Sequence, residues 1–230
     1  DAALTAYAEM GNYWTELVAE RRQTRSADLI SQILHNQVEG QELSDEEIGG
    51  FCSLLHDASQ NTTMNMIANA IIELARFPDE RRKLVDDPSR WPSALEEILR
   101  FVSPVQGLAR STTRDVEIGD ETIEKGDQVL LLYGSANHDE SVFERPDVLD
   151  LERDARNHRT FGHGIHFCLG NAVARLETRI ALQVLTERIP EYEVEESLIM
   201  RNQLVPTRGV ESAPIRFDPK RTNRVSEDPR

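Results

Sequence analysis

The chain is poor in cysteine and lacks a long apolar segment. Two cysteines, Cys52 and Cys168, occur among 230 residues, too few for a disulfide framework, which favours a reducing, cytoplasmic compartment. No apolar run approaches the roughly 18–20 residues that span a bilayer, so no membrane span is predicted. The first residues carry no basic region typical of a signal peptide. They begin inside a helical pattern without a methionine, as expected of a chain trimmed at its N-terminus.

Positively charged residues are outnumbered. The sequence has 26 Lys and Arg against 41 Asp and Glu, a net charge of −15, which argues against nucleic acid as a partner. Residues 145–179 depart from this balance, with six arginines against five acidic residues. This segment is either a surface for an acidic redox partner or a set of internal ion pairs, and the sequence favours neither. Apolar residues at 39% and charged residues at 29% are typical of a soluble globular domain.

The stretch most typical of a ligand site is Phe-Gly-His-Gly-Ile-His-Phe-Cys-Leu-Gly, residues 161–170. Glycines allow positive φ angles and a close approach of the backbone to a bulky group. A helical pattern follows from about Asn171, so Cys168 is expected beside the positive end of a helix, where the metal-ligating thiolate form is favoured. Two other interpretations are a buried structural cysteine and a zinc site, although the spacing matches no usual zinc pattern. The zinc site would use His158, His163, His166 and Cys168.

The spacing F-x-x-G-x-H-x-C-x-G resembles the haem-binding loop of the cytochrome P450 family, and all five fixed positions match. The resemblance implies haem b, iron protoporphyrin IX, as the cofactor and Cys168 as the proximal ligand of its iron, where a thiolate favours O–O cleavage. It also implies that His166 bonds a haem propionate and that Phe161 lies against the proximal face of the ring. The cofactor-binding positions that it implies within the loop are Phe161, Gly162, His166, Cys168 and Gly170.

A capping-box pattern, Ser44 to Glu47, opens a helix that is expected to run to about Arg76, ahead of Pro78. The middle of this helix, residues 58–63, reads Ala-Ser-Gln-Asn-Thr-Thr. Polar and β-branched residues are poor helix formers, so the alternative for this segment is a polar surface turn.

Residues 58–63 resemble the point where the family's long distal helix crosses the haem, with the pattern Ala/Gly-Gly-x-acid-Thr-Thr. Ala58 and Thr62 match this pattern, whereas Ser59 replaces the glycine and Asn61 replaces the acid. The resemblance implies that Ala58 lies at the cofactor. It also implies that Thr62 hydrogen-bonds the dioxygen being activated and the water that delivers its proton. Asn61 takes the second catalytic position, where an amide cannot relay protons as a carboxylic acid does.

Glu97 and Arg100 are three residues apart on an expected helix, so they share one face. They resemble the family's E-x-x-R pair, which Arg153 would complete, and the resemblance implies that this network pins the loop carrying Cys168. The alternative is an exposed pair worth a few tenths of a kcal/mol. Arg110 resembles the strand arginine that pairs with a haem propionate, a use that suits a guanidinium, and its alternative is an exposed strand arginine.

The patterns predict a mainly α fold with small β-sheets, which the resemblance identifies as the C-terminal portion of the cytochrome P450 fold. A haem-binding portion, 1–217, is expected to precede a polar C-terminal tail, 218–230. Helices are expected at about 2–22, 27–38, 45–76, 78–85, 93–102 and 171–189. Strands are expected at about 108–111, 116–118 and 128–132. The last helix is expected to bury Leu176, Ile180, Val184 and Leu185.

The resemblance implies a haem-thiolate monooxygenase of the soluble bacterial type, which inserts one oxygen atom from O2 into a small hydrophobic substrate. Its electrons would come from ferredoxin and a ferredoxin reductase. Because the resemblance covers only the C-terminal half of the family's usual chain, one alternative is a haem-binding half-domain without turnover. Another, motivated by Asn61, is an enzyme that uses peroxide or catalyses a non-hydroxylating oxidation.

Overall fold

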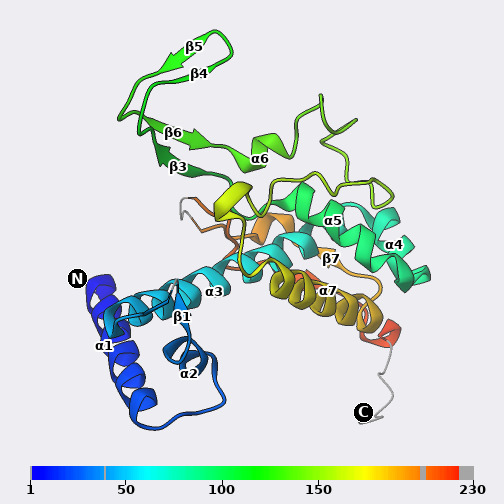
Figure 1. Cartoon of the computed structure of the whole chain (residues 1–230). Coiled ribbons are helices and arrows are strands. Elements are labelled where there is room, and N and C mark those ends of the chain that lie inside the picture. The colour runs from blue at the N-terminus through cyan, green and yellow to red at the C-terminus, as the bar shows by residue number, and fades with distance from the viewer. Residues whose placement is uncertain (1, 39, 203–205, 223–230) are drawn as a thin grey trace. The chain divides into compact units, whose positions relative to one another are not determined.

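The computed structural model describes residues 2–38, 40–202 and 206–222, and it divides the chain into two compact units (Figure 1). The first unit is Asp1–Gln60 and the second is Asn61–Arg230. The expected haem-binding portion of residues 1–217 stays a prediction. The expected polar tail, 218–230, lies outside the described residues from 223 onward.

The described elements confirm a mainly α fold with small β-sheets. The α-helices are α1 (Ala2–Gln23), α2 (Leu29–Leu34), α3 (Asp45–Arg76), α4 (Pro78–Asp86), α5 (Trp91–Val102), α6 (Tyr133–Ala136) and α7 (Asn171–Arg188). Short 3-10 turns are η1 (Pro88–Arg90), η2 (Gly164–His166), η3 (Glu196–Leu198) and η4 (Pro219–Arg221). The strands are β1 (Gln37–Val38), β2 (Gln41–Glu42), β3 (Leu108–Ser111), β4 (Val116–Ile118), β5 (Glu121–Ile123), β6 (Gln128–Leu131), β7 (Glu193–Val194) and β8 (Ile215–Arg216).

The first unit packs around a small apolar core. Its buried members are Val18, Leu34, Ile48 and Cys52. The predicted capping box opens α3, because the Glu47 N–H donates to Ser44 Oγ (3.2 Å) and the Ser44 N–H donates to Glu47 Oε2 (2.8 Å). The helix expected at 27–38 is shorter than predicted, since its last residues pair instead in the β1–β2 hairpin.

The helix α3 is continuous through residues 58–63, so the alternative of a polar surface turn is wrong. Its 32 residues end at Arg76, two residues before Pro78, as predicted. Further along α3, Asn65 and Asn69 are buried although they are polar. Asn65 Oδ1 accepts from the Val210 N–H (3.1 Å), and Asn69 Nδ2 donates to the carbonyl of Arg208 (2.8 Å). These bonds satisfy the buried amides and fasten the C-terminal segment to α3.

The main core lies in the second unit, where α4 and α5 both contact α7 (Figure 1). The apolar side of α5 is buried. Its core members are Trp91, Ala94, Leu95, Ile98, Leu99 and Val102. The helix ends at Ser103, which has a left-handed backbone (φ 36°) just before Pro104.

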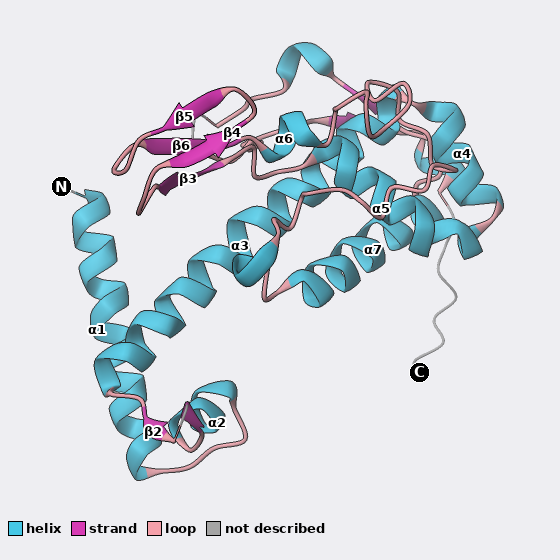
Figure 2. Ribbon diagram, turned by 45° about the horizontal axis from the view of Figure 1, so that its top comes forward, coloured by secondary structure: helices cyan, strands magenta, loops and turns pink. Residues whose placement is uncertain are grey.

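Two antiparallel ribbons of the second unit lie beside each other (Figure 2). The strands β3 and β6, which were both predicted, pair with each other, with Leu108 opposite Leu131. β4 pairs with β5 across a turn that contains Gly119, whose φ of 62° suits glycine. The strand β5 was not predicted.

The helix α7 confirms the predicted range, but the predicted buried side is wrong for three of its four residues. Leu176, Ile180 and Val184 are 39–49% exposed. The buried side carries Thr178, Leu182 and Thr186, which recur every four residues. Thr186 can be buried there because its hydroxyl donates to the carbonyl of Leu182 (3.0 Å).

Residues 138–160 contain turns and no helix or strand. This long connection crosses α5 and is fixed there by side-chain hydrogen bonds rather than by secondary structure. Across the described part of the chain, no helix is long and apolar enough to cross a membrane.

Candidate functional site

The loop of residues 161–170 is a closed turn held by its own backbone. The Cys168 N–H donates to the carbonyl of Phe161 (3.0 Å) and the Phe167 N–H donates to the carbonyl of Gly164 (3.0 Å). Gly162 and Gly164 both have φ of +73°, a conformation that side-chain-bearing residues rarely adopt. Two of the three glycines are therefore required by the path of the chain, whereas Gly170 has an ordinary φ of −82°.

Cys168 is a free, half-buried cysteine that lies just before α7. Its carbonyl accepts two hydrogen bonds from Asn171, one from the side-chain Nδ2 (2.8 Å) and one from the backbone N–H (3.3 Å). These bonds fix the cysteine to the first turn of an 18-residue helix. An anionic ligand there would face the positive end of the helix dipole.

Apolar side chains surround the cysteine and are largely exposed. Ile165 is 98% exposed and Leu169 is 74% exposed, while Phe167 contacts the edge of the Phe161 ring with a centroid distance of 6.3 Å. His166 is exposed on the turn η2. The half-buried thiol and the exposed apolar side chains beside it together form a surface that suits a large, flat, apolar group.

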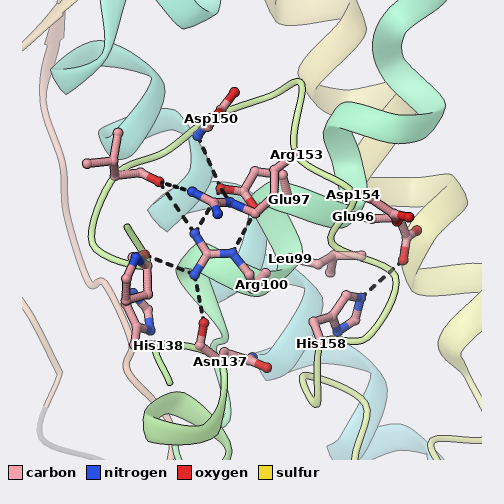
Figure 3. A network of polar contacts seen from close by, with 12 residues as sticks. Glu96, Glu97, Leu99, Arg100, Asn137, His138, Asp150, Arg153, Asp154 and His158 are labelled. Atoms are coloured by element: carbon pink, nitrogen blue, oxygen red, sulfur yellow. Dashed lines mark hydrogen bonds and ion pairs between the residues drawn. The ribbon is translucent and has the colours of Figure 1, made fainter. Parts of the chain in front are cut away.

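The zinc alternative is not supported by the arrangement of side chains. Among the residues that the structure describes, no group of three or more His, Cys, Asp or Glu side chains lies together as a metal site. His158 is buried and points at Glu96, with Nε2 3.1 Å from Oε2 (Figure 3). A lone sulfur donor instead fits an iron whose other ligands arrive with it, as in haem.

The network of Glu97, Arg100 and Arg153 is confirmed (Figure 3). Arg100 donates from Nε and Nη2 to the two carboxylate oxygens of Glu97 (2.7 and 2.8 Å), and both side chains are fully buried. Arg153 Nε donates to Glu97 Oε1 (3.2 Å). The Asp150 N–H donates to the same oxygen (3.1 Å), so one carboxylate binds the segment of residues 144–153 to α5.

Asn137 connects this network to the cysteine loop and was missed by the sequence analysis. It is fully buried, and its carbonyl accepts from Arg100 Nη1 (2.7 Å). Its side chain donates to Thr160 Oγ1 (2.9 Å) and accepts from the Arg159 N–H (2.6 Å). Because Thr160 directly precedes Phe161, the buried ion pair reaches the start of the loop, as the predicted pinning role requires.

A second carboxylate on α5, the half-buried Glu96, was also missed. Its carboxylate faces away from Glu97, accepting from His158 and from two nitrogens of Arg175 (2.8 and 3.0 Å). Burial alone would raise the pKa of Glu96, but the hydrogen bonds from His158 and Arg175 outweigh it and lower the pKa to about 2. The sequence indicates this second contact only through the adjacent glutamates Glu96 and Glu97, whose side chains point about 100° apart on a helix.

The stabilisation by Glu96 is expected to depend on pH. Its pKa is lowered from 4.5 to about 2 on folding, so its contribution is present above pH 4.5 and is lost as the pH falls towards 2. The difference in unfolding free energy between the unaltered protein and Glu96→Gln should therefore shrink steadily over this range. Urea unfolding at a series of pH values measures it, and a difference that stays constant would contradict the assigned contacts.

The remaining predicted residues lie on other elements. Arg110 is exposed on β3, and its guanidinium donates to the carbonyl of Ala109 (2.8 Å). Ala58, Asn61 and Thr62 all lie on α3, where Ala58 and Asn61 are exposed and Thr62 is half-buried. Ala58 belongs to the first unit, and Asn61 and Thr62 begin the second. The structure thus brings five of the predicted residues together in one loop and places these four elsewhere.

Comparison with known proteins gives the family. A family model described as Cytochrome P450 matches residues 92–197. Cytochrome P450 130 of Mycobacterium tuberculosis is 46% identical to the chain over 202 residues, which cover 86% of this chain and 50% of that protein. The chain belongs to the cytochrome P450 family. The matched range contains α5, the turns of residues 138–160, the cysteine loop and α7, which together form the region described above.

Other cytochromes P450 are similar over nearly the same range. The biotin biosynthesis cytochrome P450 of Bacillus subtilis is 38% identical over 206 residues, covering 90% of this chain and 52% of that protein. One solved structure is described as a cytochrome p450-like monooxygenase involved in microbial secondary metabolism. It superposes with a TM-score of 0.89 at 37% identity, over 94% of this chain and 58% of that one. The chain spans about half the length of the curated relatives that it matches.

Proposed function

We propose that this chain forms the haem-binding part of a haem-thiolate monooxygenase that inserts one oxygen atom from O2 into a small hydrophobic substrate. The cofactor is haem b, and the electrons come from a ferredoxin and its reductase. The observation that carries the proposal is the half-buried Cys168 thiol, held at the start of α7 by a glycine-containing loop. Membership of the cytochrome P450 family supports a haem cofactor at this loop.

When bound, the haem supplies the chemistry of dioxygen activation, and this chain supplies binding and orientation. Cys168 offers its sulfur to the iron. Phe161 would pack against the ring, and His166 and Arg110, both exposed, would bind the propionates. Gly162 turns the loop with its positive φ angle, and Gly170 leaves the approach to the ring free of a side chain.

On α3, the Thr62 hydroxyl would donate and accept hydrogen bonds where the dioxygen is activated. Asn61 contributes an amide in place of a carboxylic acid, so it orients water but cannot release a proton. Proton delivery would therefore depend on the Thr62 hydroxyl and on water rather than on residue 61.

A turnover assay of the purified, haem-loaded protein tests the proposal. The assay contains NADH, ferredoxin, ferredoxin reductase and a panel of small hydrophobic compounds. The expected result is a product that carries one oxygen atom from labelled O2. Haem binding without NADH-dependent product would favour a half-domain that binds haem without turnover. A product formed only with added peroxide, or one lacking a new oxygen atom, would favour the other alternative.

The Thr62→Ala protein is expected to keep its haem spectrum, but its NADH consumption should be uncoupled from product formation. Loss of the hydroxyl removes a positioned proton donor, so product per NADH should fall about 100-fold, the lower end of the range for general acid–base groups. The missing reducing equivalents should appear as hydrogen peroxide, which a peroxidase assay measures. Thr62→Ser, which keeps the hydroxyl, is the control. Unchanged coupling in Thr62→Ala would remove Thr62 from proton delivery.

A further inference from the structure

Arg175 contacts both ends of the cysteine loop from the second turn of α7. Its guanidinium carbon lies 4.5 Å from the centre of the Phe161 ring, at the start of the loop. Its Nη1 donates to Asn171 Oδ1 (2.9 Å), and Asn171 in turn donates from Nδ2 to the carbonyl of Cys168 (2.8 Å). One side chain therefore connects the residue that begins the loop to the residue that carries the sulfur.

Arg175 is itself held by α5. Glu96 accepts from Arg175 Nε (2.8 Å) and Nη2 (3.0 Å), a two-point contact that fixes the plane of the guanidinium. Glu96 also accepts from His158 Nε2, while His158 Nδ1 accepts from the Thr160 N–H (3.2 Å). The carboxylate is thus bound from two directions, and its orientation does not depend on Arg175 alone.

These contacts are separate from the ion pair of Glu97 and Arg100. The Glu97 network acts on residues 137–153 and reaches the loop only at its start, through Asn137 and Thr160. The Glu96 contacts reach the far end of the loop, where Asn171 holds the carbonyl of Cys168. Two adjacent carboxylates on α5 therefore fasten one loop, Glu97 at its start and Glu96 at both its start and its far end.

We propose that Glu96 and Arg175 are positioning residues for the cysteine ligand, which set the direction of the Cys168 sulfur by fixing its backbone between Phe161 and Asn171. This inference rests on the proposed haem ligation by Cys168. The guanidinium is neutralised by its contact with Glu96, so its shape matters more than its charge. A lysine could keep the charge but could not make the two-point contact, the stack on Phe161 and the bond to Asn171 together.

The test uses Arg175→Gln, Arg175→Lys and Glu96→Gln in the purified, haem-loaded protein. Partners of a ligand residue commonly change metal affinity by about 10- to 100-fold, so haem release to an acceptor globin should accelerate by that factor in all three variants. The reduced carbon monoxide complex should lose part of its thiolate band. Glu96→Gln combined with Arg175→Gln should release haem no faster than the worse single variant, because both changes break the same contact.

Arg156→Gln is the matched control. Its guanidinium is 81% exposed and pairs with the exposed carboxylate of Asp154, so haem release and spectrum should stay unchanged. Asn171→Ala is a second test, because it removes the side-chain hydrogen bond to the carbonyl of Cys168 and leaves the backbone bond and the Glu96–Arg175 pair in place. It should accelerate haem release even if the charged-pair variants do not fold.

The outcomes distinguish failure of the proposed function from failure of the positioning role of Glu96 and Arg175. If the unaltered protein binds no haem through a thiolate, the proposed function fails. If it does, and the folded variants release haem as slowly as Arg156→Gln with an unchanged thiolate band, the positioning role is overturned. A lower melting temperature with unchanged release and spectrum would also overturn it, because that is the result of a purely structural contact.

Discussion

Cys168→Ala should abolish the strongly red-shifted absorption band of the reduced carbon monoxide complex. The band depends on a thiolate opposite the carbon monoxide, and alanine offers no ligand at that position. Any haem that remains bound should give the spectrum of a nitrogen-ligated or weakly ligated iron. The loss is expected to be complete, because Cys52, the other cysteine of the chain, is buried in the core of the first unit.

Cys52→Ala is the control for this change. Cys52 is 5% exposed in the core of the first unit, and burial raises the pKa of its thiol, so it is disfavoured as a thiolate ligand. The red-shifted band should persist in Cys52→Ala. If the band instead survives in Cys168→Ala and disappears in Cys52→Ala, the assignment of the ligand is wrong.

Glu97→Gln should destabilise the protein more than any surface change. Glu97 and Arg100 are both fully buried, so the substitution leaves a guanidinium in the core without its counter-charge. Removing one partner of a buried pair costs about 3–5 kcal/mol of unfolding free energy. Urea unfolding followed by circular dichroism measures this loss. Haem binding should weaken as well, because Arg100 also holds Asn137 and, through it, Thr160.

Asp79→Asn is the matched comparison on the neighbouring helix. Asp79 is 90% exposed in its pair with Arg82 at the same spacing of three residues, so its removal should cost less than about 1 kcal/mol. If Glu97→Gln cost no more than Asp79→Asn, the buried pair would not stabilise the fold. The two pairs share a carboxylate, a guanidinium and a spacing of three residues, but they differ in exposure and in the number of partners of the carboxylate.

Local signals in the sequence predicted much of the helical structure. The capping box at Ser44 and the stop at Pro78 fix the ends of α3, because hydrogen bonding and ring geometry act over three or four residues. The apolar stripe of α5 is buried as its spacing of three and four residues indicates. The Glu97–Arg100–Arg153 network was also correctly anticipated, but from a family resemblance and not from the local pattern.

The errors arose where tertiary contacts decide the outcome. In α7 the larger apolar residues are partly exposed, whereas Thr178 and Thr186 are buried, so the hydrophobic pattern selected the wrong side. The contact between Glu96 and Arg175 joins residues 79 positions apart, and no periodicity relates such distant side chains. Asn137 was missed because an asparagine in a loop gives no signal until its partners are known.

X-ray absorption at the iron edge of the purified, haem-loaded protein tests the central claim most directly. We expect one sulfur atom in the first coordination shell of the iron, beside the porphyrin nitrogens, and we expect it to be absent in Cys168→Ala. A first shell of nitrogen or oxygen atoms alone in the unaltered protein would contradict the assignment of Cys168 as the haem ligand.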